Sequence, residues 1–348
     1  MKKQYVTVSP TSTCPFFVEA VRYEPERLVV NGFTLILLHA MNLHKETFST
    51  LLQHLFEDSG GNQVKEAWCI DNPNSGRSSS LNQETLKQPP YRDRWLCADY
   101  ANAVHSFIHS SPFSRYFKGE KLVAVGHSSG TCSIILMEEL NPRINFHGII
   151  WLDPAILPLH KRCSEILVEI FGTWAATKKH TWPNRSAASE ELSSPKHIAF
   201  RTWRPELVRS FVDNAIRPVD EKNPDGPVTL SCSVHQEKVC EITFDVEKTS
   251  LIIIQAHYFA PGADVAVPPA EAFLRAIQRD DLPPIHMITC LEDEYRQRQS
   301  ARDEGVANGI DQSYKELQYT ITRTRWTYVS ASRTVPSCPG NERCIAEA

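Results

Sequence analysis

The fold is decided by the stretch Lys121-Leu122-Val123-Ala124-Val125-Gly126-His127-Ser128-Ser129-Gly130-Thr131-Cys132-Ser133-Ile134-Ile135-Leu136-Met137. A lysine leads into a short apolar run, which predicts a buried strand of a parallel sheet. After Gly130 the apolar residues continue in a helical pattern. Gly126 and Gly130 let the backbones of strand and helix pass closely, so we expect a sharp strand-to-helix turn at Ser128.

The five residues of this turn, Gly126 to Gly130, match the G-x-S-x-G pattern of a nucleophile elbow, in the strand–turn–helix context that the motif requires. Such a turn exposes the Ser128 hydroxyl above the sheet, with the N-terminus of a helix beneath it. The helix dipole and the free N–H groups favour negative charge there, which is where the oxyanion of an acyl transfer develops. The stretch therefore predicts an α/β fold with Ser128 as a nucleophile.

The composition is that of a globular chain with a sizeable core: 348 residues, 41% hydrophobic and 22% charged. A formal net charge of −4 gives no electrostatic reason to expect nucleic acid or an anionic membrane as a partner. The ten cysteines include no C-x-x-C pair, and Cys69, Cys132 and Cys290 fall inside apolar runs, as buried free thiols do, which favours a reducing compartment over a disulfide framework. No signal core and no run near the ~18 apolar residues of a membrane span is present. We expect a soluble, intracellular protein.

Apolar runs alternate with helical patterns, which predicts a mostly parallel, eight-stranded α/β sheet. Besides the strand before Ser128, the expected strands are Gln4–Val8, Phe16–Arg22, Phe33–His39, Glu66–Asp71, Phe146–Leu152, Leu251–Ala256 and Ile285–Cys290. Residues 154–248 interrupt the alternation and predict an inserted helical lid, with amphipathic pieces at Cys163–Ala175 and Pro205–Ile216. Residues 1–153 and 249–292 would then form the core, and the polar residues 293–348 a peripheral or disordered tail.

A serine nucleophile needs a base, and the base needs an orienting acid. With this type of elbow, the partners follow in the order serine, acid, histidine. Asp153 closes the sixth predicted strand at the edge where the loops gather, and it is the acid that fits the strand geometry better. Asp264, in the loop after the seventh predicted strand, occupies the more usual place and stays an alternative. A cap that ends the strand is the non-catalytic interpretation of Asp153.

The base is expected in the last strand region, where His286 stands, and no histidine follows it in the chain. His257, at the end of the seventh predicted strand, is its competitor outside the lid. The oxyanion donors are expected to be the backbone N–H groups of Ser129 and of Met41, which lies in the loop after the third strand. We expect His39, in the same loop, to hydrogen-bond to loop backbone. No metal or organic cofactor is implied.

Three segments outside the elbow resemble a fungal branch of the α/β-hydrolase superfamily. The loop after the third strand, Leu38-His39-Ala40 followed by His44-Lys45-Glu46-Thr47, is similar to the corresponding loop of that branch, although the residue types of the second part alone fit a solvated helix start. The loop Asp71–Ser79 and the segment Trp151-Leu152-Asp153-Pro154 resemble the branch as well. The resemblance covers roughly the part of the chain before residue 293.

The branch includes hydrolases of host-selective-toxin biosynthesis and peroxisomal acyl-CoA hydrolases of the mycophenolic acid type. In the branch the acid follows strand six, which transfers to Asp153. The base lies in a motif that the segment from His286 to Glu292 resembles with one extra residue. The resemblance also implies a peroxisomal location, but this chain ends Ala346-Glu347-Ala348 rather than in an S-K-L-type tripeptide, so the cytoplasm is the alternative.

We therefore expect a serine hydrolase, an esterase or thioesterase, with Ser128, Asp153 and His286 as its triad. The resemblance implies a small-molecule acyl substrate, such as an acyl-CoA or polyketide-type intermediate of secondary-metabolite or toxin biosynthesis. A general carboxylesterase and a catalytically silent α/β-hydrolase-fold binding or scaffold protein stay open. An epoxide-type hydrolase normally carries an acid at the elbow, which Ser128 disfavours. The residue pattern determines neither the acyl group nor the oligomeric state.

Overall fold

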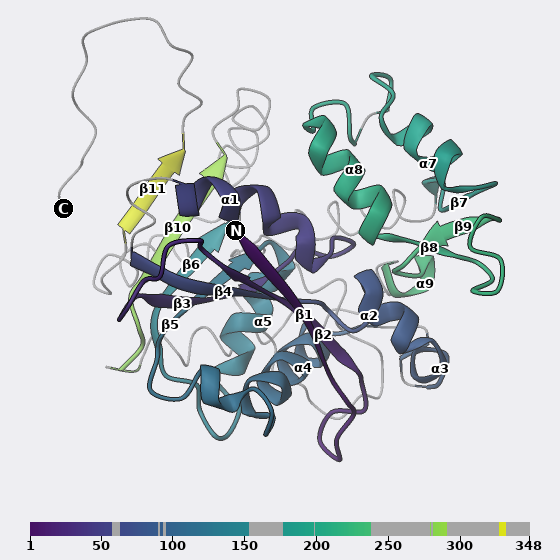
Figure 1. Cartoon of the computed structure of the whole chain (residues 1–348). Helices are drawn as coiled ribbons and strands as arrows, with labels where there is room; N and C mark the ends of the chain where they lie inside the picture. Colours follow the sequence, from purple (N-terminus) through teal and green to yellow (C-terminus); the bar gives the residue numbers. More distant parts are fainter. Residues whose placement is uncertain are drawn as a thin grey trace, which may run out of the picture.

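The protein folds around one large, twisted sheet (Figure 1). The structure, a computed structural model, describes residues 1–57, 63–89, 91–92, 95–152, 177–197, 199–237, 279, 281–290 and 327–331. Within these ranges, eight strands form the sheet in the order β1-β2-β4-β3-β5-β6-β10-β11. The strands are β1 Lys2–Val8, β2 Val18–Glu24, β3 Phe33–Leu38, β4 Val64–Ile70, β5 Lys121–His127, β6 Phe146–Leu152, β10 Ile285–Cys290 and β11 Thr327–Ala331.

All strands from β4 to β11 in this order run parallel, while β1 and β2 join the edge of β4 in antiparallel pairs. The prediction of a mostly parallel, eight-stranded α/β sheet is confirmed. β5 lies in the middle, between β3 and β6, and its residues Leu122 to Val125 are buried. A strand covered on both faces needs an apolar side chain at every position, which explains the continuous apolar run before the elbow.

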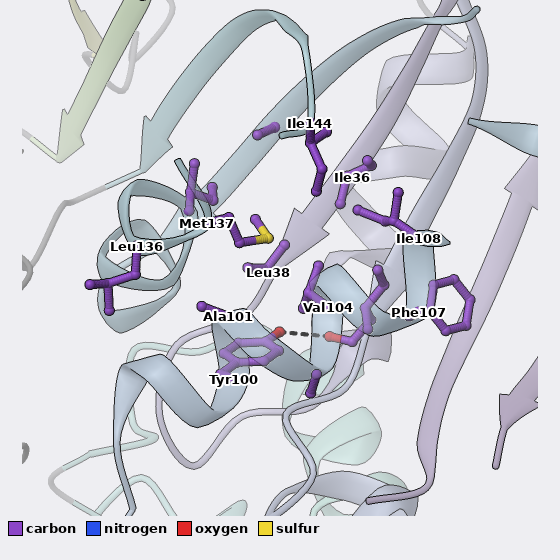
Figure 2. Close-up of a cluster of buried hydrophobic side chains, with 14 of the residues drawn as sticks. Ile36, Leu38, Tyr100, Ala101, Val104, Phe107, Ile108, Leu136, Met137 and Ile144 are labelled. Atoms are coloured by element: carbon purple, nitrogen blue, oxygen red, sulfur yellow. Dashed lines mark hydrogen bonds between the residues drawn. The ribbon is translucent and has the colours of Figure 1, made fainter. Parts of the chain in front are cut away.

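Helices cover both faces of the sheet. They are η1 Lys45–Phe48, α1 Ser49–Glu57, α2 Gly76–Leu81, α3 Gln83–Leu86, α4 Cys97–His109, η3 Ser114–Tyr116 and α5 Ser129–Met137. On one face α4 and α5 pack with alternate strand residues into the larger core, as Figure 2 shows for Ile36 and Leu38 of β3 with Val104 of α4 and Met137 of α5. On the other face, α1 buries Leu52 against a second cluster. No helix of the described part is both long and apolar enough to cross a membrane.

One buried hydroxyl of α4 links the carboxyl ends of two neighbouring strands. Tyr100 donates a hydrogen bond of 2.6 Å to the carbonyl of Ile70 at the end of β4 (Figure 2). It also accepts a hydrogen bond of 3.3 Å from the N–H of His39, just after β3. Burial raises the pKa of Tyr100 well above its usual value, so the phenol stays protonated. The loops that leave these two strands therefore start from fixed positions.

Between β6 and β10 the structure describes residues 177–197 and 199–237, which lie in the predicted insertion and are called the insertion below. They have a hydrophobic cluster of their own. The insertion contains α7 Arg185–Leu192, α8 Pro205–Asn214 and α9 Val234–Glu237, together with a small antiparallel sheet of β7 Thr181–Trp182, β9 Val228–Leu230 and β8 Ile216–Pro218. The amphipathic piece predicted at Pro205–Ile216 corresponds to α8. The small sheet was not predicted, because strands of two or three residues are too short to show a period. The piece predicted at Cys163–Ala175 lies outside the described residues.

The far edge of the main sheet differs from the sequence prediction. β10 has the bounds predicted for the last strand, but it pairs directly with β6 and, on its other side, with β11. Leu251–Ala256 is the expected strand that follows β6 in the chain, but β10 takes the place beside β6, and residues 251–256 lie outside the described residues. The sheet also extends into the predicted tail, where β11 pairs with β10. β11 covers the hydrogen-bonding edge that β10 would otherwise expose.

The elbow glycines are required for steric reasons. A Cβ atom on Gly130 would lie 2.4 Å from the carbonyl oxygen of Leu38, and one on Gly126 would lie 2.8 Å from the backbone nitrogen of Thr131. Both distances are shorter than any tolerable contact with a backbone atom. The missing side chain at Gly130 therefore lets α5 approach the end of β3, which brings the elbow and the loop after β3 together.

Gly130→Ala is expected to lower the free energy of unfolding by about 1–3 kcal/mol or more, because the clash with the Leu38 carbonyl forces the backbones apart. Gly148→Ala, in β6, is the matched control, since its Cβ would meet only the Pro284 carbonyl oxygen at 3.8 Å. Urea denaturation of both variants and the parent measures the difference. Equal stabilities of the two variants would show that the close approach is not needed.

Candidate active site

Ser128 stands between β5 and α5 in a backbone conformation that L-amino acids rarely adopt. Its φ is 49° and its ψ is −116°, whereas the residues on either side belong to regular structure. Its carbonyl oxygen accepts two hydrogen bonds from Thr131, one from the backbone N–H at 3.0 Å and one from the hydroxyl at 2.5 Å. A strained residue at such a turn is what the elbow motif requires, and strain of this kind concentrates at functional positions.

The elbow is also fixed to the end of β6. The backbone N–H of Ser128 donates a hydrogen bond of 3.0 Å to the carbonyl of Leu152, the last residue of that strand. Asp153 is the next residue in the chain and lies outside the described residues, as do His257 and Asp264. The bond therefore brings the point where the chain reaches Asp153 next to the predicted nucleophile.

The two predicted oxyanion donors are neighbours. The backbone N–H of Met41, in the loop after β3, donates a hydrogen bond of 2.8 Å to the hydroxyl of Ser129. Ser129 is the first residue of α5, and it is 9% exposed. The structure thus brings Met41 to the N-terminus of α5, beside Ser128. An oxyanion at this place would compete with the Ser129 hydroxyl for the Met41 N–H, so the hydroxyl must rotate or share it.

The peptide group that carries the Met41 N–H is held at its other end by His39. Nδ1 of His39 lies 2.8 Å from the carbonyl oxygen of Ala40, and Nε2 accepts a hydrogen bond of 3.0 Å from the N–H of Asn72. Because Nε2 is an acceptor, the proton of the neutral ring is on Nδ1 and is donated to Ala40. The carbonyl and the N–H of one peptide unit are therefore both fixed, which orients the Met41 N–H towards the elbow.

His39 is neutral despite a carboxylate nearby. Its Nε2 lies 3.6 Å from Asp71, which favours a charged ring, but the ring is 1% exposed, and burial lowers the pKa of His39 to about 4. The prediction that His39 hydrogen-bonds to loop backbone agrees with this geometry.

His39→Gln is expected to make stability less dependent on pH. An unfolded histidine has a pKa near 6.5, so below that pH the unfolded chain binds a proton that the folded protein does not bind. Stability of the parent therefore falls as the pH drops from about 6.5 towards 4. Between pH 7.5 and pH 5, the fall in the free energy of unfolding should be smaller in the variant by about 2 kcal/mol. Parallel pH profiles from urea denaturation of the two proteins would contradict a buried, neutral His39.

A buried charge cluster lies behind this loop, and the residue types alone did not reveal it. Lys45 is 1% exposed, and its ammonium group lies 2.6 Å from Glu19, 2.9 Å from Asp71 and 3.0 Å from Glu46. The interpretation of His44-Lys45-Glu46 as a solvated helix start is wrong: all three residues are buried. The charge of Lys45 is compensated by the neighbouring Glu46, by Glu19 of β2 and by Asp71 directly after β4, and the last two are distant in sequence. Glu19 gave no local signal, because the same strand also carries Arg22 and Glu24.

The charges of this cluster stabilise one another. Burial lowers the pKa of Lys45, but the attraction of Asp71, Glu46 and Glu19 outweighs it, so the net shift is upward. Burial raises the pKa of Glu46, but hydrogen bonds and charge from His44 and Lys45 lower it to about 2. Removing one partner of a buried ion pair typically costs 3–5 kcal/mol, because the other charge is left without compensation. The cluster is therefore a structural support of the loop after β3.

The described part of the chain holds no group of three or more histidine, cysteine, aspartate or glutamate side chains placed to bind a metal ion.

Comparison with known proteins agrees with the strand order and the elbow. Residues 35–310 match the Alpha/beta hydrolase family. The chain belongs to this family. The Abhydrolase domain-containing protein AFT2-1 of Alternaria alternata is 30% identical over 122 residues, which are 34% of this chain and 44% of that protein. The Type I acyl-CoA thioesterase mpaH' of Penicillium brevicompactum is 25% identical over 144 residues, which are 40% of this chain and 31% of that protein.

The chain thus matches less than half the length of these relatives. The matches confirm the predicted resemblance to fungal α/β hydrolases. Among solved structures, the peroxisomal alpha-beta-hydrolase Lpx1 from Saccharomyces cerevisiae has a TM-score of 0.60 at 14% identity, covering 95% of this chain and 82% of that one. A thioesterase domain from the curacin biosynthetic pathway has a TM-score of 0.53 at 13% identity, covering 95% and 93%. At these identities the likeness concerns the fold.

In an α/β hydrolase the base follows the acid along the chain and stands at the carboxyl edge of the sheet. His286 is only the second residue of β10, opposite Ile150 of β6, which in turn lies opposite Val125 of β5. His286 is therefore two strands from β5 and three residues short of Ser128 along the strand direction, about 14 Å between the two Cα atoms. The structure does not bring His286 to the elbow, and residues 332–348, after β11, contain no histidine.

Proposed function

We propose that this α/β hydrolase cleaves an ester or thioester bond of a small-molecule acyl substrate with Ser128 as its nucleophile. The observation that carries the proposal is the elbow: a single serine is held at φ 49° at the start of α5, beside the Met41 N–H. A backbone conformation with this cost is hard to explain unless the hydroxyl at its apex is used.

The mechanism follows from these positions. The Ser128 hydroxyl attacks the carbonyl carbon of the acyl group while a histidine removes its proton. The negative charge that develops on the carbonyl oxygen is stabilised by the N–H groups of Ser129 and Met41. The same histidine then protonates the leaving thiol or alcohol, and water releases the acid from the acyl-enzyme. Asp153, next in the chain to the Leu152 carbonyl that holds the elbow, is the acid proposed to orient the imidazole.

The proposed substrate class comes from the relatives. One is described as a Type I acyl-CoA thioesterase, and a structural neighbour as a thioesterase domain of a biosynthetic pathway. We extend this to an acyl-CoA or polyketide-type intermediate of secondary-metabolite or toxin biosynthesis. A peroxisomal location is proposed from the resemblance to the fungal branch and from the description of the structural neighbour Lpx1 as peroxisomal.

Ser128→Ala is expected to abolish labelling by a fluorophosphonate probe and to lower the turnover of activated thioesters to the background rate, because no other hydroxyl stands at the apex of the turn. Gel fluorescence and a thiol-release assay measure the two effects. Ser133→Ala is the matched control, since it removes another buried hydroxyl of α5, one that donates 3.1 Å to the Cys97 carbonyl. Turnover by Ser128→Ala at the parent rate would refute the assignment of the nucleophile.

The remaining triad positions are tested by two pairs of variants. Asp153→Asn should lower kcat on the order of 10⁴-fold, as loss of the orienting acid does in other triads. Asp264→Asn should change kcat far less, and the reverse ranking would move the acid to Asp264.

For the base, His286→Ala and His257→Ala are compared in the same assay. The variant that loses both labelling and turnover identifies the base. The kcat of the parent enzyme should then fall as the pH drops through the pKa of that histidine.

The position of His286 within β10 favours one second candidate, a catalytically silent binding protein with this fold. That function requires the parent itself to remain unlabelled by the fluorophosphonate probe at pH 8 while retaining affinity for an acyl ligand. Labelling of the parent that depends on Ser128 excludes it.

A further inference from the structure

We propose that a cavity between α2 and the insertion binds the phosphate joined to the pantetheine arm of a coenzyme A thioester, with Arg77 and Arg217 as the residues that hold it. The inference rests on the proposed function, because it names the leaving group of the acyl transfer at Ser128. It assigns recognition of that group to a place away from the elbow, so its loss would change binding rather than chemistry.

The cavity lies where the loop after β4 meets the insertion. Its volume is about 330 Å³, which is within the range of small-molecule sites. Arg77 and Ser80 of α2 line it on one side. Asp213 of α8 and Arg217 of β8 line it on the other. α2 and β8 lie side by side (Figure 1), so a ligand here would touch both the core and the insertion.

Arg217 has unused hydrogen-bonding capacity. Its Nη1 donates a hydrogen bond of 3.3 Å to the carbonyl of the neighbouring Pro218, whereas its buried Nε has no partner. Burial lowers the pKa of Arg217, which the charge of Glu221 opposes only in part. No acid of the described residues forms an ion pair with Arg217. A half-buried guanidinium without a counter-charge favours an anion, and its planar fork matches the geometry of a phosphate.

Two of the three acids on the cavity wall are compensated within the buried cluster. The ammonium group of Lys45 lies 2.6 Å from Glu19 and 3.0 Å from Glu46. Arg77 adds a second guanidinium: its Nε lies 3.2 Å from Glu19, which leaves its Nη groups for a ligand. Asp213, the third acid, is exposed and has no ion pair in the described part of the chain. Two guanidinium groups thus face one free carboxylate, which favours a negatively charged ligand.

The distance from the cavity to the nucleophile fits the length of the arm. The register places Ala20 of β2 level with Gly126 of β5, three strands away. Glu19 of the cavity wall and Ser128 both lie beyond that level, at the carboxyl edge, about 15 Å apart at ~4.8 Å per strand. In a coenzyme A thioester, about thirteen bonds join the sulfur to the nearest phosphorus, which is about 15 Å in an extended chain. A thioester held at the elbow can therefore place this phosphate in the cavity.

Three thioesters of one acyl group test the phosphate: those of coenzyme A, phosphopantetheine and pantetheine. Phosphopantetheine should lower KM about 10-fold relative to pantetheine with kcat unchanged, because a remote group is bound equally in the ground state and the transition state. Coenzyme A should lower KM little further. Equal KM values for the phosphopantetheine and pantetheine thioesters would overturn the proposal, and so would a lower KM seen with coenzyme A alone.

Arg217→Gln should raise KM for the phosphopantetheine thioester about 10-fold, to the value of the pantetheine thioester, because it removes the uncompensated charge. Arg77→Gln should raise KM by a smaller factor, because its Nε is already engaged by Glu19. Neither variant should change KM for the pantetheine thioester, whereas a loss of structure would affect all three substrates. A rise in KM that is the same with and without the phosphate would contradict the assignment.

Arg209→Gln is the matched control, since Arg209 is exposed on α8 and does not line the cavity. It should keep the parental KM for all three thioesters. Asp213→Asn reports the sign of the ligand's charge. Loss of this carboxylate should leave KM for the phosphopantetheine thioester unchanged or lower it, because a negative charge beside the phosphate is removed. A higher KM would indicate that the cavity binds a cation, and the proposal would fail.

Calorimetry with the parent protein tests the site without turnover. Phosphopantetheine should bind at least several-fold more tightly than pantetheine or inorganic phosphate, and Arg217→Gln should reduce its affinity to that of pantetheine. Equal affinities for phosphopantetheine and inorganic phosphate would identify a site for free phosphate and overturn the inference. If Ser128→Ala keeps the parental turnover, the proposed nucleophile fails instead, and these affinities still decide whether the cavity binds the arm.

Discussion

The arrangement of the candidate site depends on one buried carboxylate, that of Asp71, directly after β4. It accepts hydrogen bonds of 2.8 Å from the backbone N–H and 2.9 Å from the ammonium group of Lys45, and its own N–H donates 2.9 Å to the Glu19 carbonyl. Gly76 has no side chain, which gives the carboxylate room, because a Cβ there would lie 2.6 Å from it. A buried charge of this kind is tolerated only when it is paired and hydrogen-bonded, so the loops after β3 and β4 and the start of β2 have to assemble together.

The loop after β3 contacts this assembly through Lys45, α5 through Met41 and the insertion through Leu43. Tyr100 fixes the point where the loop leaves the strand, His39 fixes the carbonyl of the Ala40–Met41 peptide, and Ser129 accepts from its N–H. A backbone donor acts on a transition state only if it is aimed before the charge develops, because reorientation during the reaction would cost the energy that the donor supplies. The number of contacts on this one peptide unit is consistent with such a requirement.

The sequence predicted most of the sheet because a parallel sheet buried on both faces leaves a strong local signal. β6 and β10 have the predicted bounds, and Gly126 and Gly130 marked the elbow by their spacing. β11 was missed because five residues at a sheet edge carry little pattern. The cluster around Lys45 was missed because its partners come from distant strands, and burial of a lysine contradicts what its residue type favours.

The candidate site was predicted in part for the same reason. Ser128, Ser129 and Met41 follow from motif and strand order, which are local properties. The base could not be derived in this way, since its place depends on which strand is last, and the position of His286 shows how much one additional strand changes.

In the proposed function, the backbone of Ser128 places activity and stability in opposition. At φ 49° and ψ −116° a glycine would be relaxed, since it lacks the Cβ that makes this conformation costly. A laboratory selection that rewarded thermal endurance alone would therefore favour glycine at position 128 and discard the hydroxyl. Variant libraries designed to stabilise this protein should keep position 128 constant and vary the exposed residues of α1 and α7.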